Sequence, residues 1–409
     1  MAGFSLLAYL PFFDNGFISD DWVILDRAQA LTSQPFHLFD KPPDQFRLTS
    51  YLSFLLLHTI FGQHPWGFYI WSWGLHLLNV LLTVKLGRQL FASRNAAWTA
   101  ALCLAVLQNP HEAVAWLSAM NESLMTLFAL LTAIAWMKGR RAWAALAFLA
   151  ALFSKESAVV LLALLPLLDW VAIRCGAQKT RRALLPGYGF LLLPAAVFGL
   201  AYWAAWEQHS MLQQGYYRLG PQAAGVMLWS LHRLAFPYLY LALSAFLADR
   251  RRFPGEAMAW GLGLAALALL PYCFLTYQGH VASRHTYLAS VALCLLLGVL
   301  LDRFSRPLLR WGFVALFLVG NGAYLWLAKD AQLQARAAPT TELRRVLTQM
   351  EAQPVLLPNF PLNPWMARLA ARSLDGWTGR ELRFADTPCP GCPRLLWKDG
   401  AYSVDTSEQ

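Results

Sequence analysis

The sequence predicts an all-α polytopic membrane protein of about 11 transmembrane helices, with a small α/β appendage at its C-terminus. Its 409 residues are 57 % hydrophobic and 14 % charged, with a mean hydropathy of +0.41, whereas roughly a quarter of the residues in soluble domains are charged. Apolar runs such as residues 257–275 suit helices that cross ~30 Å of hydrocarbon. The composition changes after residue 328, because residues 329–409 carry ten basic and nine acidic side chains.

Hydropathy sets the predicted spans. The first span, residues 1–13, is short for a crossing, so we expect a tilted helix or a start further upstream. It lacks a basic start and a cleavage site, so we do not expect a cleaved signal peptide. Residues 50–61 are too short to span, which favours a helix lying on the outer leaflet. The predicted spans are residues 1–13, 66–84, 95–107, 117–137, 142–153, 158–173, 184–206, 223–247, 255–275, 286–301 and 311–328.

The charges of the connecting loops predict their orientation. Five loops together hold 16 basic residues and two acids, whereas the intervening loops hold ten acids and six bases. Basic loops face the cytoplasm, so the first loop (14–65) and the C-terminal appendage are predicted to be exported. Basic charge spread over loops in this way also argues against nucleic acid as a partner. The basic residues are Lys85, Arg88, Arg94, Lys138, Arg140, Arg141, Arg174, Lys179, Arg181, Arg182, Arg250, Arg251, Arg252, Arg303, Arg306 and Arg310.

A polar turn, Ser154 to Ser157 (SKES), joins two short apolar runs at residues 142–153 and 158–173. A first run of about a dozen residues makes roughly 18 Å of helix, so the turn is expected below the outer surface. Polar non-helical backbone at that depth is tolerated only inside protein or beside a water-filled cavity. The turn therefore predicts a cavity.

The C-terminal appendage, residues 329–409, is the second predicted domain, after a membrane domain of residues 1–328. TELRRVLTQME, PVLLPNF and WMARLAARSL predict a helix, a short strand and a helix, whose core is thin for about 80 residues and is expected to pack on the membrane domain. Cys389 and Cys392 are predicted to form a disulfide, since an exported segment meets an oxidising compartment. A zinc half-site and a redox-active pair are the alternatives.

Two adjacent carboxylates, Asp20 and Asp21 in NGFISDDWVILDRA, are the first candidate site. Carboxylates favour helix N-termini, so both acids would simply start the helix that follows. In the functional interpretation, one carboxylate accepts a proton from an acceptor hydroxyl, and the other hydrogen-bonds or binds a cation. The residues alone leave both interpretations open.

Two further polar groups lie in outer loops. Pro110 ends a helix and leaves His111 and Glu112 at the outer face, where Glu112 is either a surface acid or part of a site. Lys155 and Glu156 of the SKES turn form either an internal ion pair or a site in which the lysine faces a lipid phosphate.

Cations complete the set. Arg233 would lie about ten residues into its span, roughly 15 Å deep, where a buried arginine needs an anion. SRHTYLAS brings Arg284, His285 and Tyr287 to the start of the span at 286–301, and Arg47 precedes residues 50–61. Each of these two arginines either snorkels to headgroups or binds a ligand. Carboxylates and cations at one membrane face suit a phosphate-bearing lipid and a nucleophile that must lose a proton.

Four segments resemble the GT-C superfamily of polyprenyl-phosphate-sugar-dependent glycosyltransferases. They are DDW with the following FRLTSYLSFLLLHTIFGQHPWGFYIWSWGLHLLNVLL, QNPHEAVAWLSAMNESLM, LFSKESAVVLLALL and SRHTYLAS. The likeness covers roughly residues 10–300 and is closest to bacterial relatives of the O-mannosyltransferases that carry TPR repeats. This sequence has no such repeats, and SAMNES stands where the family has a GRADL-like stretch.

The resemblance implies an inverting transfer of a hexose such as mannose from a polyprenyl phosphate to a hydroxyl of a glycan, lipid or protein, at the periplasmic side of a bacterial inner membrane. It implies Asp20 or Asp21 as the base, with Asp21 slightly preferred, and Glu112 as a second acid. Asp20 and Glu112 would hold a divalent cation, Mg²⁺ or Mn²⁺, if the reaction uses one; the sequence establishes no other cofactor. Lys155, Arg233, Arg284 and Arg47 would bind the donor phosphate, and His111, Glu156, His285 and Tyr287 the substrates.

Other functions remain alternatives. A lipid-linked glycan transporter or flippase would also place charges in a cavity, although it would more often show two similar halves and ionisable residues near the midplane. An O-antigen ligase or polymerase would need a large outward loop rich in arginine and histidine late in the chain, whereas residues 276–285 are short. A structural subunit is the third alternative.

Overall fold

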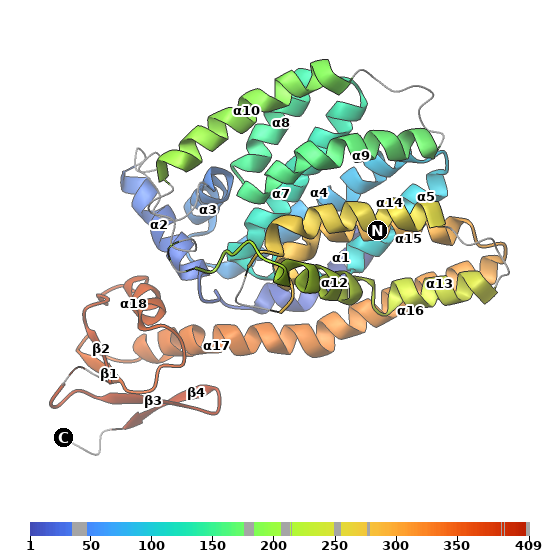
Figure 1. Ribbon diagram of the computed structural model, residues 1–409. Helices are drawn as coiled ribbons and strands as arrows, with labels where there is room; N and C mark the ends of the chain where they lie inside the picture. Colours follow the sequence, from blue (N-terminus) through green and yellow to red (C-terminus); the bar gives the residue numbers. More distant parts are fainter. Residues whose placement is uncertain are drawn as a thin grey trace.

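The computed structural model describes residues 1–34, 47–175, 184–205, 213, 215–248, 255–275, 279–385, 387 and 389–405. It is a body of apolar helices with a small C-terminal sheet, so the predicted fold class is confirmed (Figure 1). Several basic loop residues that carry the orientation argument, including Lys179, Arg181 and Arg250, lie outside the described residues.

The helices of the body follow the apolar runs. They are α1 (Ala2–Tyr9), α2 (Asp21–Ser33), α3 (Leu48–Phe61), α4 (Pro65–Leu90), α5 (Arg94–Val106), α6 (Glu112–Ala115), α7 (Met120–Met137), α8 (Arg141–Leu152), α9 (Leu161–Arg174), α10 (Leu184–Ala205), α12 (Gln222–Ala235), α13 (Tyr238–Ala248), α14 (Gly255–Leu269), α15 (Tyr287–Asp302) and α16 (Pro307–Tyr324).

One predicted span, residues 223–247, is wrong as a single helix. It is broken between α12 and α13, which meet at 68°. Pro237 lies at the break, and proline has no N–H for the helical ladder and clashes with the preceding turn. By length and composition, five described helices can cross a membrane, or six if this bent pair counts as one. The count of about 11 crossings therefore stays a prediction.

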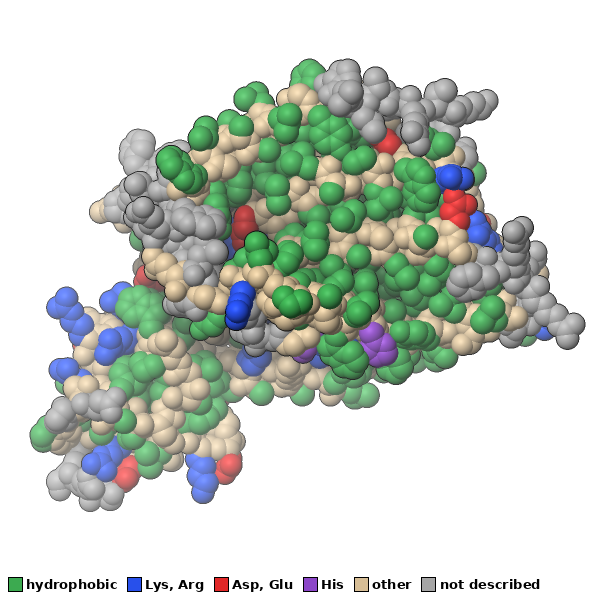
Figure 2. Space-filling view, viewed as in Figure 1, with side chains coloured by type: hydrophobic (Ala, Val, Ile, Leu, Met, Phe, Trp, Pro, Cys, Tyr) green, Lys and Arg blue, Asp and Glu red, His purple; other side chains and the backbone are tan. Residues whose placement is uncertain are grey.

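The centre of the body is α15, which packs between α5 and α14. Small residues allow this close approach: a Cβ added at Gly298 would lie 2.3 Å from the Ala96 carbonyl oxygen of α5, and one added at Gly261 of α14 would lie 2.8 Å from Leu296. Close approach at glycine and alanine is typical of helices that pack within membranes. Hydrophobic side chains also cover the visible outer face of the body (Figure 2).

A single helix of 41 residues, Pro307–Leu347, runs from the body to the C-terminal domain (Figure 1). It comprises α16, a π-helical turn at Leu325–Lys329 and α17 (Asp330–Leu347), and it spans about 60 Å at 1.5 Å per residue. The predicted domain boundary at residue 328 therefore falls inside a continuous helix.

The C-terminal domain has its own core, built around Leu347, Val355 and Leu395. Its sheet has the order β2-β1-β3-β4, in which β1 pairs parallel with β2 and β3, and β4 pairs antiparallel with β3. The domain packs on the body through α18 against α2, as the thin core led us to expect. The elements are β1 (Val355–Leu357), α18 (Pro364–Arg372), β2 (Leu382–Phe384), β3 (Arg394–Lys398) and β4 (Ala401–Asp405).

Candidate functional site

A cavity of about 1250 Å³ lies among α2, α3, α10, the SKES turn and the residues before α15. Its polar lining comes from segments far apart in the sequence, which the fold brings together at the ends of helices. It contains many of the predicted site residues. These are Asp20, Arg47, Lys155, Glu156, Arg284 and His285.

Lys155 belongs to a buried ion network at the inner wall of the cavity. Its ammonium contacts the carboxylate of Glu122, and the same carboxylate contacts Nδ1 of His285. The Tyr272 hydroxyl donates to Oε2 of Glu122 at 3.0 Å, and its ring stacks on His285 at 4.5 Å. The Lys155 and Glu122 side chains are 4 % and 1 % exposed. Burial lowers the pKa of Lys155, although Glu122 opposes the shift.

Arg47 and Glu156 form a second, more open pair on the cavity wall. The Arg47 guanidinium donates to Oε1 of Glu156 at 3.1 Å, with the side chains 16 % and 34 % exposed. Thr49, two residues after Arg47, donates to the Ser154 hydroxyl at 2.8 Å and ties the start of α3 to the SKES turn. Lys155 and Glu156 of the turn therefore form ion pairs with residues of other segments, Glu122 and Arg47, and the turn also borders a cavity.

Asp20 and Asp21 differ sharply in environment. Asp21 is 0 % exposed, and its carboxylate accepts hydrogen bonds from the backbone N–H groups of Ile18 (2.8 Å) and Ser118 (2.5 Å). Burial raises the pKa of Asp21 to about 7, against those two hydrogen bonds. Asp20 is exposed and lines the cavity. Asp21 therefore ties two loops together, whereas Asp20 faces the cavity.

Glu112 forms a cluster at the edge of the cavity. Its carboxylate accepts a hydrogen bond from Arg336 of α17 at 2.9 Å and lies 3.6 Å from the Arg284 guanidinium. Both guanidinium groups lie over the Trp116 ring, at 4.2 Å and 4.9 Å from its centre. Burial alone would raise the pKa of Glu112, but Arg284, His111 and Arg336 hold it below its usual value. The helix that leads to the C-terminal domain thus reaches the cavity wall.

Besides Asp21 and Glu112, three further predicted site residues do not line the cavity. His111 is 3 % exposed and its Nδ1 lies 3.0 Å from the Gln108 carbonyl oxygen, while Tyr287 is 0 % exposed and its hydroxyl bonds to Nδ1 of His76 at 2.6 Å. Arg233 was expected to be buried within a span, and this is wrong. Its side chain is exposed, because α12 ends at Ala235 and places it in the last turn.

The two carboxylates that were predicted to hold a metal, Asp20 and Glu112, have different surroundings. Asp20 lines the cavity, but Glu112 does not, and both Glu112 oxygens contact arginine groups. Within the described part of the chain, no cluster of three or more His, Cys, Asp or Glu side chains could hold a metal ion. The residues present therefore do not fit the cation site that we expected. In the C-terminal domain, Cys389 and Cys392 form a disulfide.

Four important residues were not among the predicted sites: Glu122, Tyr272, Trp116 and Arg336. The sequence does carry a signal for Glu122, since an acid in the first turn of an apolar span is costly unless it has a partner. Arg336 has no such signal, because it lies far along the chain in a segment that looks solvated. The aromatic residues are indistinguishable from the many others in the sequence.

Comparisons with known proteins identify the fold. No model of a protein family matches the sequence, and no curated protein matches it. The structure is similar to that of ArnT from Cupriavidus metallidurans in its apo state (TM-score 0.57, 14 % identity, 90 % of this chain and 82 % of that chain). It is also similar to ArnT bound to undecaprenyl phosphate (TM-score 0.56, 14 % identity, 97 % and 92 %). The chain therefore shares its fold with ArnT.

Proposed function

We propose that the protein transfers a sugar from a polyprenyl phosphate to an acceptor hydroxyl, with the reaction in the cavity described above. The observation that carries the proposal is the cavity's lining, in which an exposed carboxylate, Asp20, shares one space with Arg47, Lys155 and Arg284. The shared fold supports it, since ArnT has been solved with undecaprenyl phosphate. The loop charges support a cavity on the periplasmic side of a bacterial inner membrane.

Asp20 is the base in this proposal, in place of the slightly preferred Asp21. A general base must reach the proton that it removes, and Asp20 lines the cavity, whereas Asp21 is enclosed and engaged with two backbone N–H groups. The acceptor oxygen bonds to the anomeric carbon as Asp20 takes its proton. The bond from that carbon to the phosphate oxygen breaks on the opposite face, its electron pair leaves with polyprenyl phosphate, and the configuration inverts.

The cations stabilise the phosphate that leaves. Negative charge develops on its oxygen in the transition state, and cations fixed in advance stabilise such charge strongly. Arg27, which the sequence did not single out, also lines the cavity and lies over the Tyr51 ring at 4.1 Å. Arg47 and Lys155 each have a close carboxylate partner, so we assign them to holding the phosphate site in shape. We assign direct contact to Arg27, which forms no ion pair among the described residues, and to Arg284, whose guanidinium lies 3.6 Å from Glu112 at the cavity wall.

The position of the polar groups favours a transferase over the alternative of a lipid-linked glycan transporter. Glu122 and Lys155 lie at the ends of α7 and α8, His285 just before α15, and Arg47 just before α3. A transporter would more often hold its ionisable groups near the middle of its helices, between two related halves.

The test compares Asp20→Asn with Asp26→Asn, because both residues lie on α2 or at its start and both line the cavity. A strain that lacks the gene is complemented with each variant, and its surface glycans and glycoproteins are compared by mass spectrometry. We expect Asp26→Asn to restore the glycan and Asp20→Asn to fall about 10²–10⁴-fold in transfer. Full restoration by Asp20→Asn would remove the base assignment. The transferase proposal would be wrong if two results came together: deletion of the gene changes no glycan, and the purified protein does not bind undecaprenyl phosphate.

A further inference from the structure

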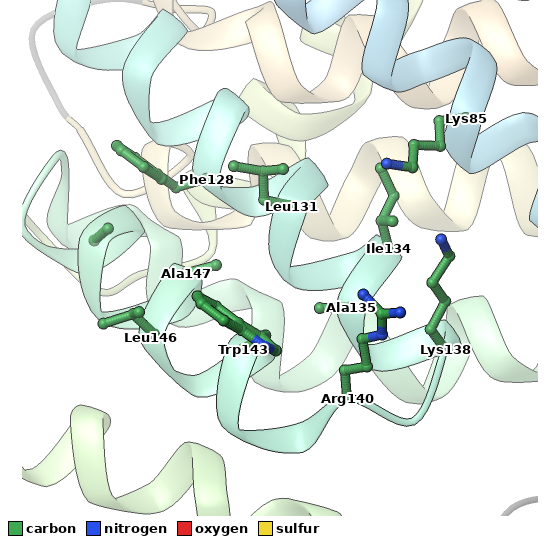
Figure 3. A pocket seen from close by; sticks show the side chains of 11 residues that line it. Lys85, Phe128, Leu131, Ile134, Ala135, Lys138, Arg140, Trp143, Leu146 and Ala147 are labelled. Atoms are coloured by element: carbon green, nitrogen blue, oxygen red, sulfur yellow. The ribbon is translucent and has the colours of Figure 1, made fainter.

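A second hollow, of about 350 Å³, runs along the hairpin that α7 and α8 form, from the turn between the two helices to Ala150 (Figure 3). We call it the hairpin groove. Lys138 and Arg140, in the turn between the two helices, and Lys85 of α4 line one end of it. Lys138 follows Glu122 of the cavity by 16 residues along α7, which corresponds to about 24 Å.

The charges at the end of the groove are all positive. Lys85, Lys138 and Arg140 are exposed, and no acidic side chain lines the groove. Within the described ranges, these three cations also form no ion pair, since each salt bridge there involves other basic residues. Like charges gathered at one point repel one another, and an anion placed among them removes that cost.

The rest of the groove is apolar. Figure 3 shows the three cations at one end, with Phe128 and Leu146 toward the other. Trp143 and Leu146 of α8 are 65 % and 58 % exposed, so the wall of the groove faces outward rather than into the helical body. A soluble anion would use the cations and leave this wall unused, while simple snorkelling of the lysines to headgroups would need no groove.

The geometry points to an anionic membrane phospholipid as the occupant of the hairpin groove. Its phosphodiester lies among Lys85, Lys138 and Arg140, and one acyl chain lies along α7 and α8 toward Phe128. Basic pockets between transmembrane helices on the cytoplasmic side are suited to anionic headgroups, and the loop charges place this turn on that side. The site is separate from the cavity and does not depend on sugar transfer.

Binding has a structural consequence. The groove runs up to Ala150, two residues before Leu152, which lines the cavity. A lipid in the groove therefore holds together the two helices that carry Glu122 and Lys155 at their far ends. Because such a lipid binds only the folded protein, it raises the thermal stability of the full chain.

The experiment titrates the delipidated, full-length protein with phosphatidylglycerol or phosphatidylcholine of the same acyl chains, and measures bound lipid by native mass spectrometry. We expect phosphatidylglycerol to bind at least tenfold more tightly. The triple variant Lys85→Gln, Lys138→Gln, Arg140→Gln should lose this preference. The matched control, Arg88→Gln, Arg94→Gln, Arg303→Gln, removes three exposed cations outside the groove and should keep it.

A second variant tests the groove without a change of charge. Ala147→Trp fills the apolar part and should weaken phosphatidylglycerol binding about as much as the triple substitution does. Equal loss in the groove variant and the control would overturn the proposal, because it would show a general effect of positive charge. Unchanged binding in Ala147→Trp would also overturn it.

Discussion

The cavity and the cations of the hairpin groove lie at opposite ends of α7 and α8, and their charged side chains differ in burial and in partners. In the cavity, Lys155 and Arg47 each have a carboxylate partner, and Lys155 is buried. In the groove, the cations are exposed, and no carboxylate lines the hollow. A buried charge is tolerated only with a partner, whereas an exposed charge is solvated by water or headgroups. The cations of the cavity should therefore support the fold, and those of the groove should not.

The largest expected loss of stability comes from a substitution in the buried network of Lys155 and Glu122. Lys155→Met leaves the Glu122 carboxylate without the ammonium beside it, and removal of one partner of a buried pair costs about 3–5 kcal/mol. Lys138→Met, the control at the other end of the hairpin, should change stability by less than about 0.5 kcal/mol. Thermal unfolding of both purified variants measures the difference, and similar shifts would contradict the comparison.

A double variant checks the cause. Because Glu122→Gln removes the stranded charge, the pair Lys155→Met with Glu122→Gln should be more stable than Lys155→Met alone. Residues in direct contact couple in this way, by about 0.5–3 kcal/mol. Additive losses would mean that the two side chains act independently.

The second prediction concerns a buried carboxyl that forms no ion pair among the described residues. Asp21 is enclosed, the charge of Asp20 lies near it, and burial raises its pKa to about 7. The folded protein therefore holds a proton between about pH 4 and 7 that the unfolded chain releases, so the contribution of Asp21 to stability increases as the pH falls through this range.

Asp21→Asn removes the pH dependence of stability that Asp21 causes. Its side-chain amide has one oxygen and one NH₂ group, so the NH₂ group faces one of the two backbone N–H donors and a hydrogen bond is lost. We expect the variant to be less stable than the wild type by about 1–3 kcal/mol at pH 5.5, and by less at pH 8, where the wild type carries a buried negative charge. Melting temperatures of both proteins at the two pH values test this. A gap that widens toward pH 8 would show that the carboxylate is stabilised in its charged form.

The third prediction uses the more open pair of the cavity. Arg47→Gln should cost only about 1 kcal/mol, because partly exposed pairs contribute little to stability. In a transfer assay it should raise the KM for the lipid donor more than it lowers kcat, since Glu156 and the cavity wall lose a cation. Arg27→Gln, which breaks no ion pair among the described residues, serves as the comparison and should raise KM with no loss of stability.

The sequence predicted those parts of the molecule that depend on local pattern. Apolar runs located the helices, and the polar SKES turn between two short runs predicted a cavity, because both arguments need only neighbouring residues. The break between α12 and α13 was also readable, since Pro237 lies within the predicted span. Because the predicted span is broken there, Arg233 lies in the last turn of α12 and is exposed, whereas we expected it to be buried.

Long-range contacts were out of reach. Two hydrogen bonds, Ser118 to Asp21 and Arg336 to Glu112, depend on how segments far apart in the sequence meet in the fold. Two adjacent aspartates look alike in a sequence, and only the fold separates the enclosed one from the one that lines the cavity. The family resemblance in the sequence led to the helical membrane fold, which the structure shares with ArnT, while the roles of individual residues depend on their surroundings.

The smallest expected effect concerns the cluster of Glu112, Arg284 and Arg336, whose side chains are more exposed than the buried network of the cavity and, unlike the cations of the groove, form ion pairs. Arg336 is 32 % exposed and shares Glu112 with Arg284, so Arg336→Gln leaves the carboxylate with a cation and should cost about 0.5 kcal/mol or less. Arg345→Gln, which breaks the exposed pair with Glu342 on the same helix, is the matched control. Because Arg336 and Arg284 lie over the same Trp116 ring at the cavity wall, only Arg336→Gln should raise the donor KM. An equal donor KM in the two variants would show that Arg336 on α17 does not contribute to donor binding in the cavity.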